Sequence, residues 1–253
     1  MRPARVALAV ALPLLVLVAW QLVSWIASPR EWMLPSPAAV GQAAWGARDR
    51  LWFHAQWTVL IAVIGLLLAV ALGSAIAYLI ARSRIARLAL YPWVVVSQVI
   101  PLVALAPLLV LWFPPFVAIV ALAVLMSIFP VVVAGVDGLR GTDPDLVRAA
   151  RGLGADEGWA WRHVRVPAAL PRLFTGIRLA AVFVVSGAVV GELVASDRGL
   201  GALTRLSAGQ FETPVTFAGV VLLALIGLAL FGAVALAERA ALPWTRRATR
   251  RGS

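Results

Sequence analysis

The chain has 253 residues, of which 62% are hydrophobic, and its mean hydropathy is +0.96; a soluble domain is nearer half apolar, so a soluble fold is excluded. Its formal net charge is +11, and all 22 basic residues are arginine. Without lysine the chain cannot carry a Walker A ATPase loop, and without cysteine it has no disulfide or thiolate metal site. In so hydrophobic a chain the positive charge favours a membrane protein with a positive-inside bias over a nucleic-acid binder.

The first predicted element is an apolar run over residues 6–27, which follows Arg2 and Arg5. It is long enough to cross the roughly 30 Å hydrocarbon core of a bilayer. A cleaved signal peptide begins in the same way, but its apolar region is shorter, so we favour a retained span. Residues 28–56 are mixed in character and predict a segment at the membrane interface, where indole rings settle. Its markers are Trp45, Leu51 and Trp52, with Trp57 at its end.

Five further apolar runs predict membrane-spanning helices, so we expect an all-α membrane protein with six spans. Prolines interrupt the third span at Pro101 and Pro107 and the fourth at Pro130. No internal repeat or low-complexity tract divides the chain, which predicts a single domain over residues 1–253. The five runs cover residues 57–81, 88–112, 116–136, 174–195 and 215–237.

Six spans place both termini on one side of the membrane, together with residues 140–171. That side would hold 17 of the 22 arginines and the other side five. Because cytoplasmic loops are enriched in basic residues, this split predicts cytoplasmic termini and a cytoplasmic 140–171 loop. The larger group is Arg2, Arg5, Arg82, Arg84, Arg87, the seven arginines from Arg140 to Arg178, Arg239, Arg246, Arg247, Arg250 and Arg251. The smaller group is Arg30, Arg48, Arg50, Arg198 and Arg205.

Residues 142–171 form the longest stretch that is too polar to cross a membrane. Asp143 followed by Pro144 is a helix start signal, because a carboxylate can cap the helix and proline needs no N–H at the first position. Leu146, Ala150 and Leu153 then recur at helical spacing and predict an apolar stripe. Arg148 and Arg151 flank the stripe, and Gly152 and Gly154 follow as helix-ending or close-contact residues.

A second short helix is predicted over residues 156–164, with Trp159 and Trp161, before Pro167 and Pro171 mark the return to the membrane. The physical features describe a basic-flanked helix of small residues at a membrane face. It could dock a soluble partner, or it could be a solvated loop between two spans.

The spacing of this loop resembles the cytoplasmic signature of ABC importer permeases, written E-A-A-x3-G-x9-I-x-L-P. Arg148-Ala149-Ala150 stands at E-A-A, Gly154 at the glycine, Val164 at the isoleucine, and Val166-Pro167 at the final pair. Two replacements are conservative, whereas Arg148 reverses a charge. The resemblance implies that the loop contacts an ATPase through Asp143, Leu146, Arg148, Ala149, Ala150, Leu153, Gly154, Val164 and Pro167.

Four other stretches resemble the same family, so the likeness covers nearly the whole chain. They point to the branch that carries nitrate, sulfonates, taurine, and thiamine or riboflavin precursors. The stretches are Leu34-Pro35-Ser36-Pro37, residues 97–113, residues 136–140, and Gly191-Glu192 with the following Ser196-Asp197-Arg198-Gly199-Leu200-Gly201.

The resemblance implies a type I importer permease in the bacterial inner membrane, working as half of a homodimeric pore by alternating access. A cytoplasmic ATPase dimer would hydrolyse ATP, with its Mg²⁺, and an extracytoplasmic binding protein would deliver substrate; this chain would need no cofactor. A thiamine pyrimidine or riboflavin is the first substrate expectation, with sulfonate, taurine or nitrate as alternatives. Two other classes stay open: a passive channel, which needs no docking loop, and an intramembrane enzyme, for which few buried acids are available.

Four residues are candidates for the substrate path. Ser97 and Gln98 lie beside the Pro101 break, where irregular backbone is tolerated if it lines a cavity; helix–helix hydrogen bonding is the rival role. Glu192 is the only acid well inside a predicted span, so it is either a pore or gate residue or an acid paired with Arg198 or Arg205. His54 and His163, far apart in sequence, are not expected to bind metal or catalyse.

Overall fold

The computed structural model describes the backbone of residues 3–26 and 33–244 and the side chains of this part apart from residues 3–10 and 13. All regular secondary structure in these ranges is helical. Arg2, Arg30, Arg246, Arg247, Arg250 and Arg251, which contribute to the predicted charge bias, lie outside the described residues. The elements are α1 (Pro3–Ile26), α2 (Pro37–Gly46), α3 (Arg48–Arg82), α4 (Arg84–Val99), α5 (Leu102–Trp112), α6 (Pro115–Arg140), α7 (Pro144–Gly152), α8 (Glu157–Ala160), the π-helical turn η1 (Trp161–Arg165), α9 (Val166–Ala195), α10 (Leu200–Gly209) and α11 (Thr213–Ala241).

Four helical stretches are long and apolar enough to cross a bilayer within the described residues. They are α3, α6, the continuous run Glu157–Ala195 and α11, and they contain the predicted spans 57–81, 116–136, 174–195 and 215–237. α1 covers the first predicted span as a helix. The helix has 24 residues, and Leu14–Ile26 is the apolar stretch in which every side chain is described.

The third predicted span is not one straight helix. α4 and α5 meet at Ile100-Pro101 with a bend of 104°, so the pair is a broken span or a re-entrant segment. Pro101 lacks an N–H, and the residue before a proline is pushed out of the helical region, as the extended ψ of 123° at Ile100 shows. The sequence predicted a span over 88–112 interrupted by prolines, and the bend lies at the first of them, Pro101.

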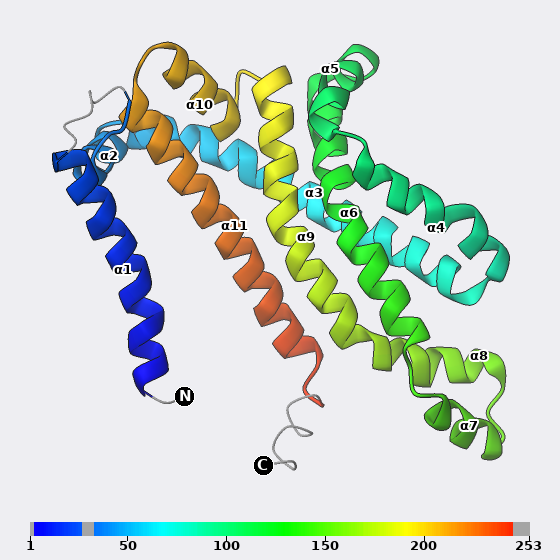
Figure 1. Ribbon diagram of the computed structural model, residues 1–253. Helices are drawn as coiled ribbons and strands as arrows, with labels where there is room; N and C mark the ends of the chain where they lie inside the picture. Colours follow the sequence, from blue (N-terminus) through cyan, green and yellow to red (C-terminus); the bar gives the residue numbers. More distant parts are fainter. Residues whose placement is uncertain (1–2, 27–32, 245–253) are drawn as a thin grey trace.

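The interfacial segment predicted over residues 28–56 does not end where the structure begins the next helix. α3 begins at Arg48 and runs for 35 residues, about 52 Å at 1.5 Å per residue, so residues 48–56 continue directly into the span. Figure 1 shows α3 crossing obliquely behind α11, α9 and α6, which accounts for its greater length. Trp45 and Trp52 are exposed, whereas the half-buried Trp57 packs edge-on against Phe116 of α6.

The centre of the molecule is the packed pair α6 and α9, which run side by side in Figure 1 and are crossed by α3. Small residues allow their backbones to approach closely, as in other membrane helix pairs. A Cβ added to Gly187 would lie 2.7 Å from Ala123 Cα, and one added to Gly191 would lie 2.8 Å from Ile119 Cγ2. These helices thus form a rigid unit whose lower end leads directly into α7 and α8.

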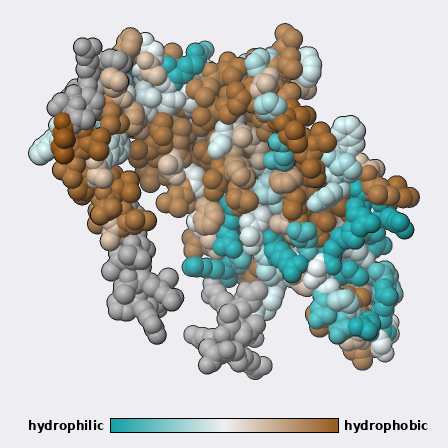
Figure 2. Space-filling model, in the orientation of Figure 1, coloured by the Kyte–Doolittle hydropathy of each residue, from teal (hydrophilic) through white to brown (hydrophobic). Residues whose placement is uncertain are grey.

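Hydrophobic surface covers most of the helical body in Figure 2, whereas hydrophilic surface gathers at the end that carries α7 and α8. α1 diverges from the body in Figure 1 and contacts it mainly near its own C-terminal end, through α2 and through Trp20 against Phe217. The fold therefore presents one polar loop, α7 to η1, at one end of a hydrophobic bundle.

Candidate functional site

α7 begins where the sequence predicts it. The Asp143 carboxylate accepts a 2.8 Å hydrogen bond from the Asp145 N–H, and Pro144 occupies the first turn. Thr142, just before the cap, is buried and directs its hydroxyl to the Gly138 and Leu139 carbonyls at the end of α6. The helix is thus fixed to α6 by a short, fully capped connection.

Gly154 ends α7 in a Schellman motif. The Ala155 N–H donates to the Ala150 carbonyl at 3.1 Å and the Gly154 N–H donates to the Arg151 carbonyl at 2.9 Å, which is the 6→1 and 5→2 pair of that motif. The motif requires a left-handed residue, and Gly154 has φ of +89°. The physical role of the glycine is therefore conformational, since a Cβ at this position would meet open space.

The face of α7 that packs inward is not the predicted apolar stripe. Val147 is buried, whereas Leu146 is 54% and Leu153 is 90% exposed. Sequence reasoning overlooked Val147, because a single apolar residue one position from Leu146 gives no periodic signal. Leu153 lines a hollow of about 570 Å³ together with Ala150, Gly154 and Trp159, among others. An exposed apolar knob beside a hollow is the shape of a docking surface.

Trp161 anchors the loop to the helical body. It is buried, its ring is approached edge-on by Tyr78 of α3, and the guanidinium groups of Arg82 and Arg165 lie 5.6 and 5.1 Å from its centroid. Its indole N–H donates to Glu157 at 3.1 Å. The cluster is completed by Leu139 and Ala169. The sequence predicted interfacial tryptophans, but this one links α3, α6 and α9 to the loop.

Two ion pairs organise the charges of the loop. Arg151 pairs with Glu157 and so ties α7 to α8, while Arg148 pairs with Asp145 one turn earlier in its own helix. Both pairs are at least half exposed, so their contribution to stability is small. The reversed charge at Arg148 is therefore balanced locally by Asp145.

The chain re-enters the body at Pro167, one of the two prolines that the sequence placed at the return to the membrane. α8, η1 and α9 form one continuous run, in which the Val166 N–H bonds the Trp161 carbonyl five residues back. This π turn directly precedes Pro167, which then occupies the first turn of α9, where a missing N–H costs least. Val164 and Pro167 are half-buried at this junction, where α8 continues through η1 into α9.

A second polar site lies at the other end of α9, around Glu192. The side chain is fully buried, and its carboxylate accepts hydrogen bonds from the Thr58 hydroxyl at 2.8 and 3.0 Å and from the Gly201 N–H at 2.8 Å. The Thr58 oxygen in turn accepts from the Leu200 N–H at 2.8 Å. Gly199 has φ of +98°, and an added Cβ would collide with the Glu192 carboxyl. The network fastens the start of α10 to α3 and α9, and we name Glu192, Thr58 and residues 199–201 the carboxylate latch.

The ion pair considered for Glu192 is absent among the described residues. Arg198 lies over the rings of Phe53 and Trp57, and Arg205 donates to the Ser196 carbonyl at 3.2 Å. Backbone and hydroxyl donors take the place of the arginines because the carboxylate points inward, toward α3. Thr58 carried no signal in the sequence, since a threonine within an apolar span is common.

The remaining candidate residues are spread apart. The Ser97 hydroxyl donates to the Val94 carbonyl of its own helix at 2.8 Å, and Gln98 is exposed next to the Pro101 bend. His54 Nδ1 lies 2.9 Å from the Gly199 carbonyl, and His163 stacks on Trp159. No group of three or more potential metal ligands occurs in the part of the chain described here.

Comparison with known proteins gives concordant matches. Residues 65–242 match the family described as "Binding-protein-dependent transport system inner membrane component". The chain is 35% identical to the formylaminopyrimidine transport permease protein ThiX of Halalkalibacterium halodurans, over 92% of this chain and 94% of that protein. It is 37% identical to the riboflavin transport system permease protein RibX of Chloroflexus aurantiacus, over 91% and 87%.

More distant matches agree with these. The putative aliphatic sulfonates transport permease protein SsuC of Bacillus subtilis is 32% identical over 92% of this chain and 86% of that protein. A solved structure titled "Crystal structure of an amino acid ABC transporter with histidines" superposes with a TM-score of 0.61 at 21% identity, over 77% of this chain and 95% of that one. At this identity the superposition shows a shared fold.

Proposed function

Because the chain belongs to the family of binding-protein-dependent transport system inner membrane components, we propose that it is the membrane subunit of an ATP-driven importer of an aromatic vitamin precursor. That it is an ABC importer permease for a small solute follows from the family match together with relatives above 30% identity along nearly the whole chain. This agreement is the observation that carries the conclusion. The substrate, the stoichiometry and the residue roles are the proposed part.

The proposed assembly has two copies of this chain, two ATPase subunits at α7 and α8, and a solute-binding protein at the opposite membrane face. The exposed side chains of Leu146 and Leu153, the latter lining the hollow, support the docking role. The other proposed docking residues are Asp143, Arg148, Ala149, Ala150, Gly154, Val164 and Pro167. ATP and Mg²⁺ would be held by the ATPase subunits, since this chain has no lysine for a Walker A loop. The chain itself would carry out no covalent chemistry.

The proposed mechanism is alternating access driven from the loop. When the ATPase subunits close on ATP, they would draw the two copies of α7 and α8 together. The buried Trp161 cluster and the unbroken Glu157–Ala195 helix support transmission of this movement to α3, α6 and α9. The helices would tilt and open the pore to the side where the binding protein delivers its solute.

An aromatic nitrogen heterocycle is the proposed substrate, because ThiX and RibX, whose names give formylaminopyrimidine and riboflavin, are 35% and 37% identical to this chain. A sulfonate is the second candidate, supported by the 32% identity to SsuC. Ser97, Gln98 and Pro101 at the α4–α5 bend remain the proposed path residues. Glu192 would join them only if the carboxylate latch opened, since its carboxylate is buried here.

The test is native purification followed by reconstitution. The tagged chain is isolated from gently solubilised membranes, its partners are identified by mass spectrometry, and the assembly in liposomes is assayed for ATP-dependent uptake of formylaminopyrimidine, riboflavin and an alkanesulfonate. We expect an ATPase and a binding protein to co-purify and one heterocycle to be imported. Uptake of the sulfonate alone would refute the substrate class, and uptake without ATP by the isolated chain would refute the importer mechanism in favour of a passive channel.

A further inference from the structure

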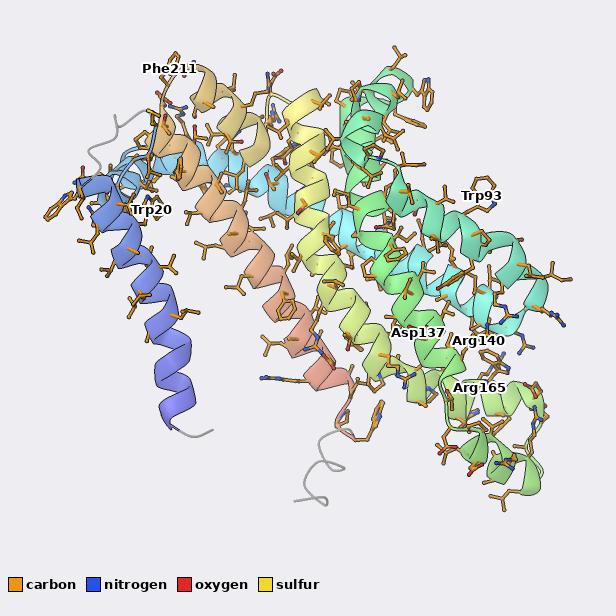
Figure 3. The ribbon with its side chains drawn as sticks, in the orientation of Figure 1. Trp20, Trp93, Asp137, Arg140, Arg165 and Phe211 are labelled. Carbon is orange, nitrogen blue, oxygen red and sulfur yellow. The ribbon has the colours of Figure 1, made fainter. Side chains whose placement is uncertain are left out.

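A basic cavity that the transport function leaves unused lies between α4, α6 and α9, at the end of the bundle that carries α7. It has a volume of about 640 Å³, within the range of small-molecule sites. Three helices each contribute one arginine to its lining: Arg87 from α4, Arg140 from α6 and Arg172 from α9. Figure 3 shows Arg140 and Asp137 together at this end of α6. Three guanidinium groups that line one cavity favour the binding of an anion.

The positive charge of the cavity is not neutralised by the described part of the chain. None of the three arginines forms an ion pair there; the ion-paired arginines are Arg48, Arg50, Arg148, Arg151 and Arg178. The Asp137 carboxylate also lines the cavity, which leaves a formal excess of two positive charges over the four groups. Arginine presents five N–H donors in a planar fork that suits phosphate oxygens.

The position of one arginine is built into the backbone. Arg172 Nη1 donates to the Asp137 carbonyl at 2.9 Å, which orients the guanidinium and leaves its other donors available. Gly141 makes room for it, because a Cβ at that position would collide with Arg172 Nη1. A single methyl group at Gly141 would therefore displace the guanidinium without changing the charge of the chain.

The surroundings of the cavity point to a lipid as the source of the phosphate. Tyr91 lines it next to Arg87, and aromatic residues with a polar tip mark the headgroup level of a membrane. α4 has no buried residue within this chain, and the exposed apolar side chains Leu88 and Trp93 flank the cavity residues along it. Acyl chains can lie along this surface while the headgroup enters the cavity, an arrangement known for basic pockets between membrane helices.

We propose that the cavity of Arg87, Arg140 and Arg172 binds the phosphodiester headgroup of an anionic phospholipid. The site is distinct from the docking loop and from the α4–α5 bend. It lies between α4, which has no buried residue, and the packed α6–α9 pair, so lipid occupancy would hold α4 against the body.

The experiment uses the full chain, with the subunits that co-purify, after delipidation in detergent. Phosphatidylglycerol, phosphatidylcholine or inorganic phosphate is added; native mass spectrometry counts retained lipids and thermal unfolding reports stabilisation. For wild type we expect retention and stabilisation with phosphatidylglycerol alone. The double variant Arg87→Gln/Arg172→Gln should bind it roughly 30-fold more weakly, given the loss of two arginine–lipid contacts.

Two further variants separate the site from general effects of charge. Arg84→Gln removes an exposed arginine at the start of α4 that does not line the cavity, and it should retain phosphatidylglycerol as wild type does. Gly141→Ala keeps every charge and should lose retention. The proposal is overturned if the double variant retains lipid normally, if Arg84→Gln weakens binding equally, or if inorganic phosphate stabilises wild type as well as phosphatidylglycerol does.

Discussion

Individual residues in this chain stabilise the structure through backbone geometry and buried hydrogen bonds more than through exposed ion pairs. Gly154 is needed for a left-handed turn, and the buried Glu192 carboxylate accepts hydrogen bonds from the Thr58 hydroxyl and the Gly201 N–H. A buried polar group left without its partner costs about 1–3 kcal/mol, whereas an exposed ion pair contributes between zero and about 1 kcal/mol. Substitution is therefore expected to have larger effects at Gly154, Glu192 and Thr58 than at Arg148.

Substitution of Thr58 tests the carboxylate latch. Thr58→Val keeps the volume but removes the hydroxyl, which leaves the Leu200 N–H and part of the Glu192 carboxylate unsatisfied; we expect a loss of about 1–3 kcal/mol in unfolding free energy. Thermal unfolding of the purified protein in detergent measures it. Thr58→Ser retains the hydroxyl and serves as the matched control. Equal stability of Thr58→Val and wild type would contradict the role of the latch.

Paired glycine substitutions test the Schellman turn. Gly154→Ala places a Cβ at φ of +89° and should cost about 1–2 kcal/mol locally, weakening ATPase co-purification and transport. Gly152→Ala, two residues earlier, has neither a positive φ nor a nearby atom, so it should behave as wild type. A larger side chain in Gly154→Arg should abolish docking while leaving membrane insertion intact. Normal transport by Gly154→Arg would remove the support for the docking assignment.

At the scale of elements, the loop α7–α8 is held to the helical body by the buried side chain of Trp161. Trp161 contacts α3 through Tyr78 and Arg82 and packs among side chains of α6 and α9. The π turn carries the chain past Pro167, so α8, η1 and α9 form one continuous helical run. This continuity supports the proposal that a displacement of the loop is transmitted to α9.

Removal of the Trp161 side chain should separate the loop α7–α8 from the helical body. Trp161→Ala empties a buried site and is expected to cost about 3–5 kcal/mol, concentrated in the loop. Hydrogen exchange of residues 144–165 should accelerate, and ATP hydrolysis by the assembly should no longer drive uptake. Trp93→Ala, whose side chain points away from the bundle in Figure 3 and is 71% exposed, is the matched control. Unchanged exchange in Trp161→Ala would show that the loop is held by other contacts.

The molecule as a whole has a polar end, which carries α7 and α8, and an opposite end, where the carboxylate latch lies. The helices α6 and α9 run between these two ends. The described arginines follow this division, since Arg82, Arg84, Arg87 and the 140–178 group lie toward the α7 end. The excess predicts that this end faces the cytoplasm. In that orientation the latch holds α10 at the face where a binding protein would dock.

The orientation can be tested directly because the chain has no cysteine of its own. Gln210→Cys, exposed at the end of α10, should react with a membrane-impermeant maleimide in right-side-out vesicles. Arg84→Cys, exposed between α3 and α4, should react only after the membrane is permeabilised. The reverse pattern would invert the topology and exclude cytoplasmic docking by α7.

The amino-acid sequence by itself determined the features that depend on neighbours along the chain. The lengths of the apolar runs located four spans, Asp143-Pro144 located the start of α7, and the residue spacing in the loop identified the family. Helix caps, turns and the length of an apolar run are properties of neighbouring residues, so the sequence contains them. The tertiary structure alone decided which partners meet: Thr58 and Gly201 at Glu192, Val147 and not Leu146 in the core, Trp161 between three helices, and the 104° turn of α4 against α5. These contacts join residues up to 134 positions apart, and within an apolar span the sequence periodicity does not distinguish a face toward lipid from a face toward protein.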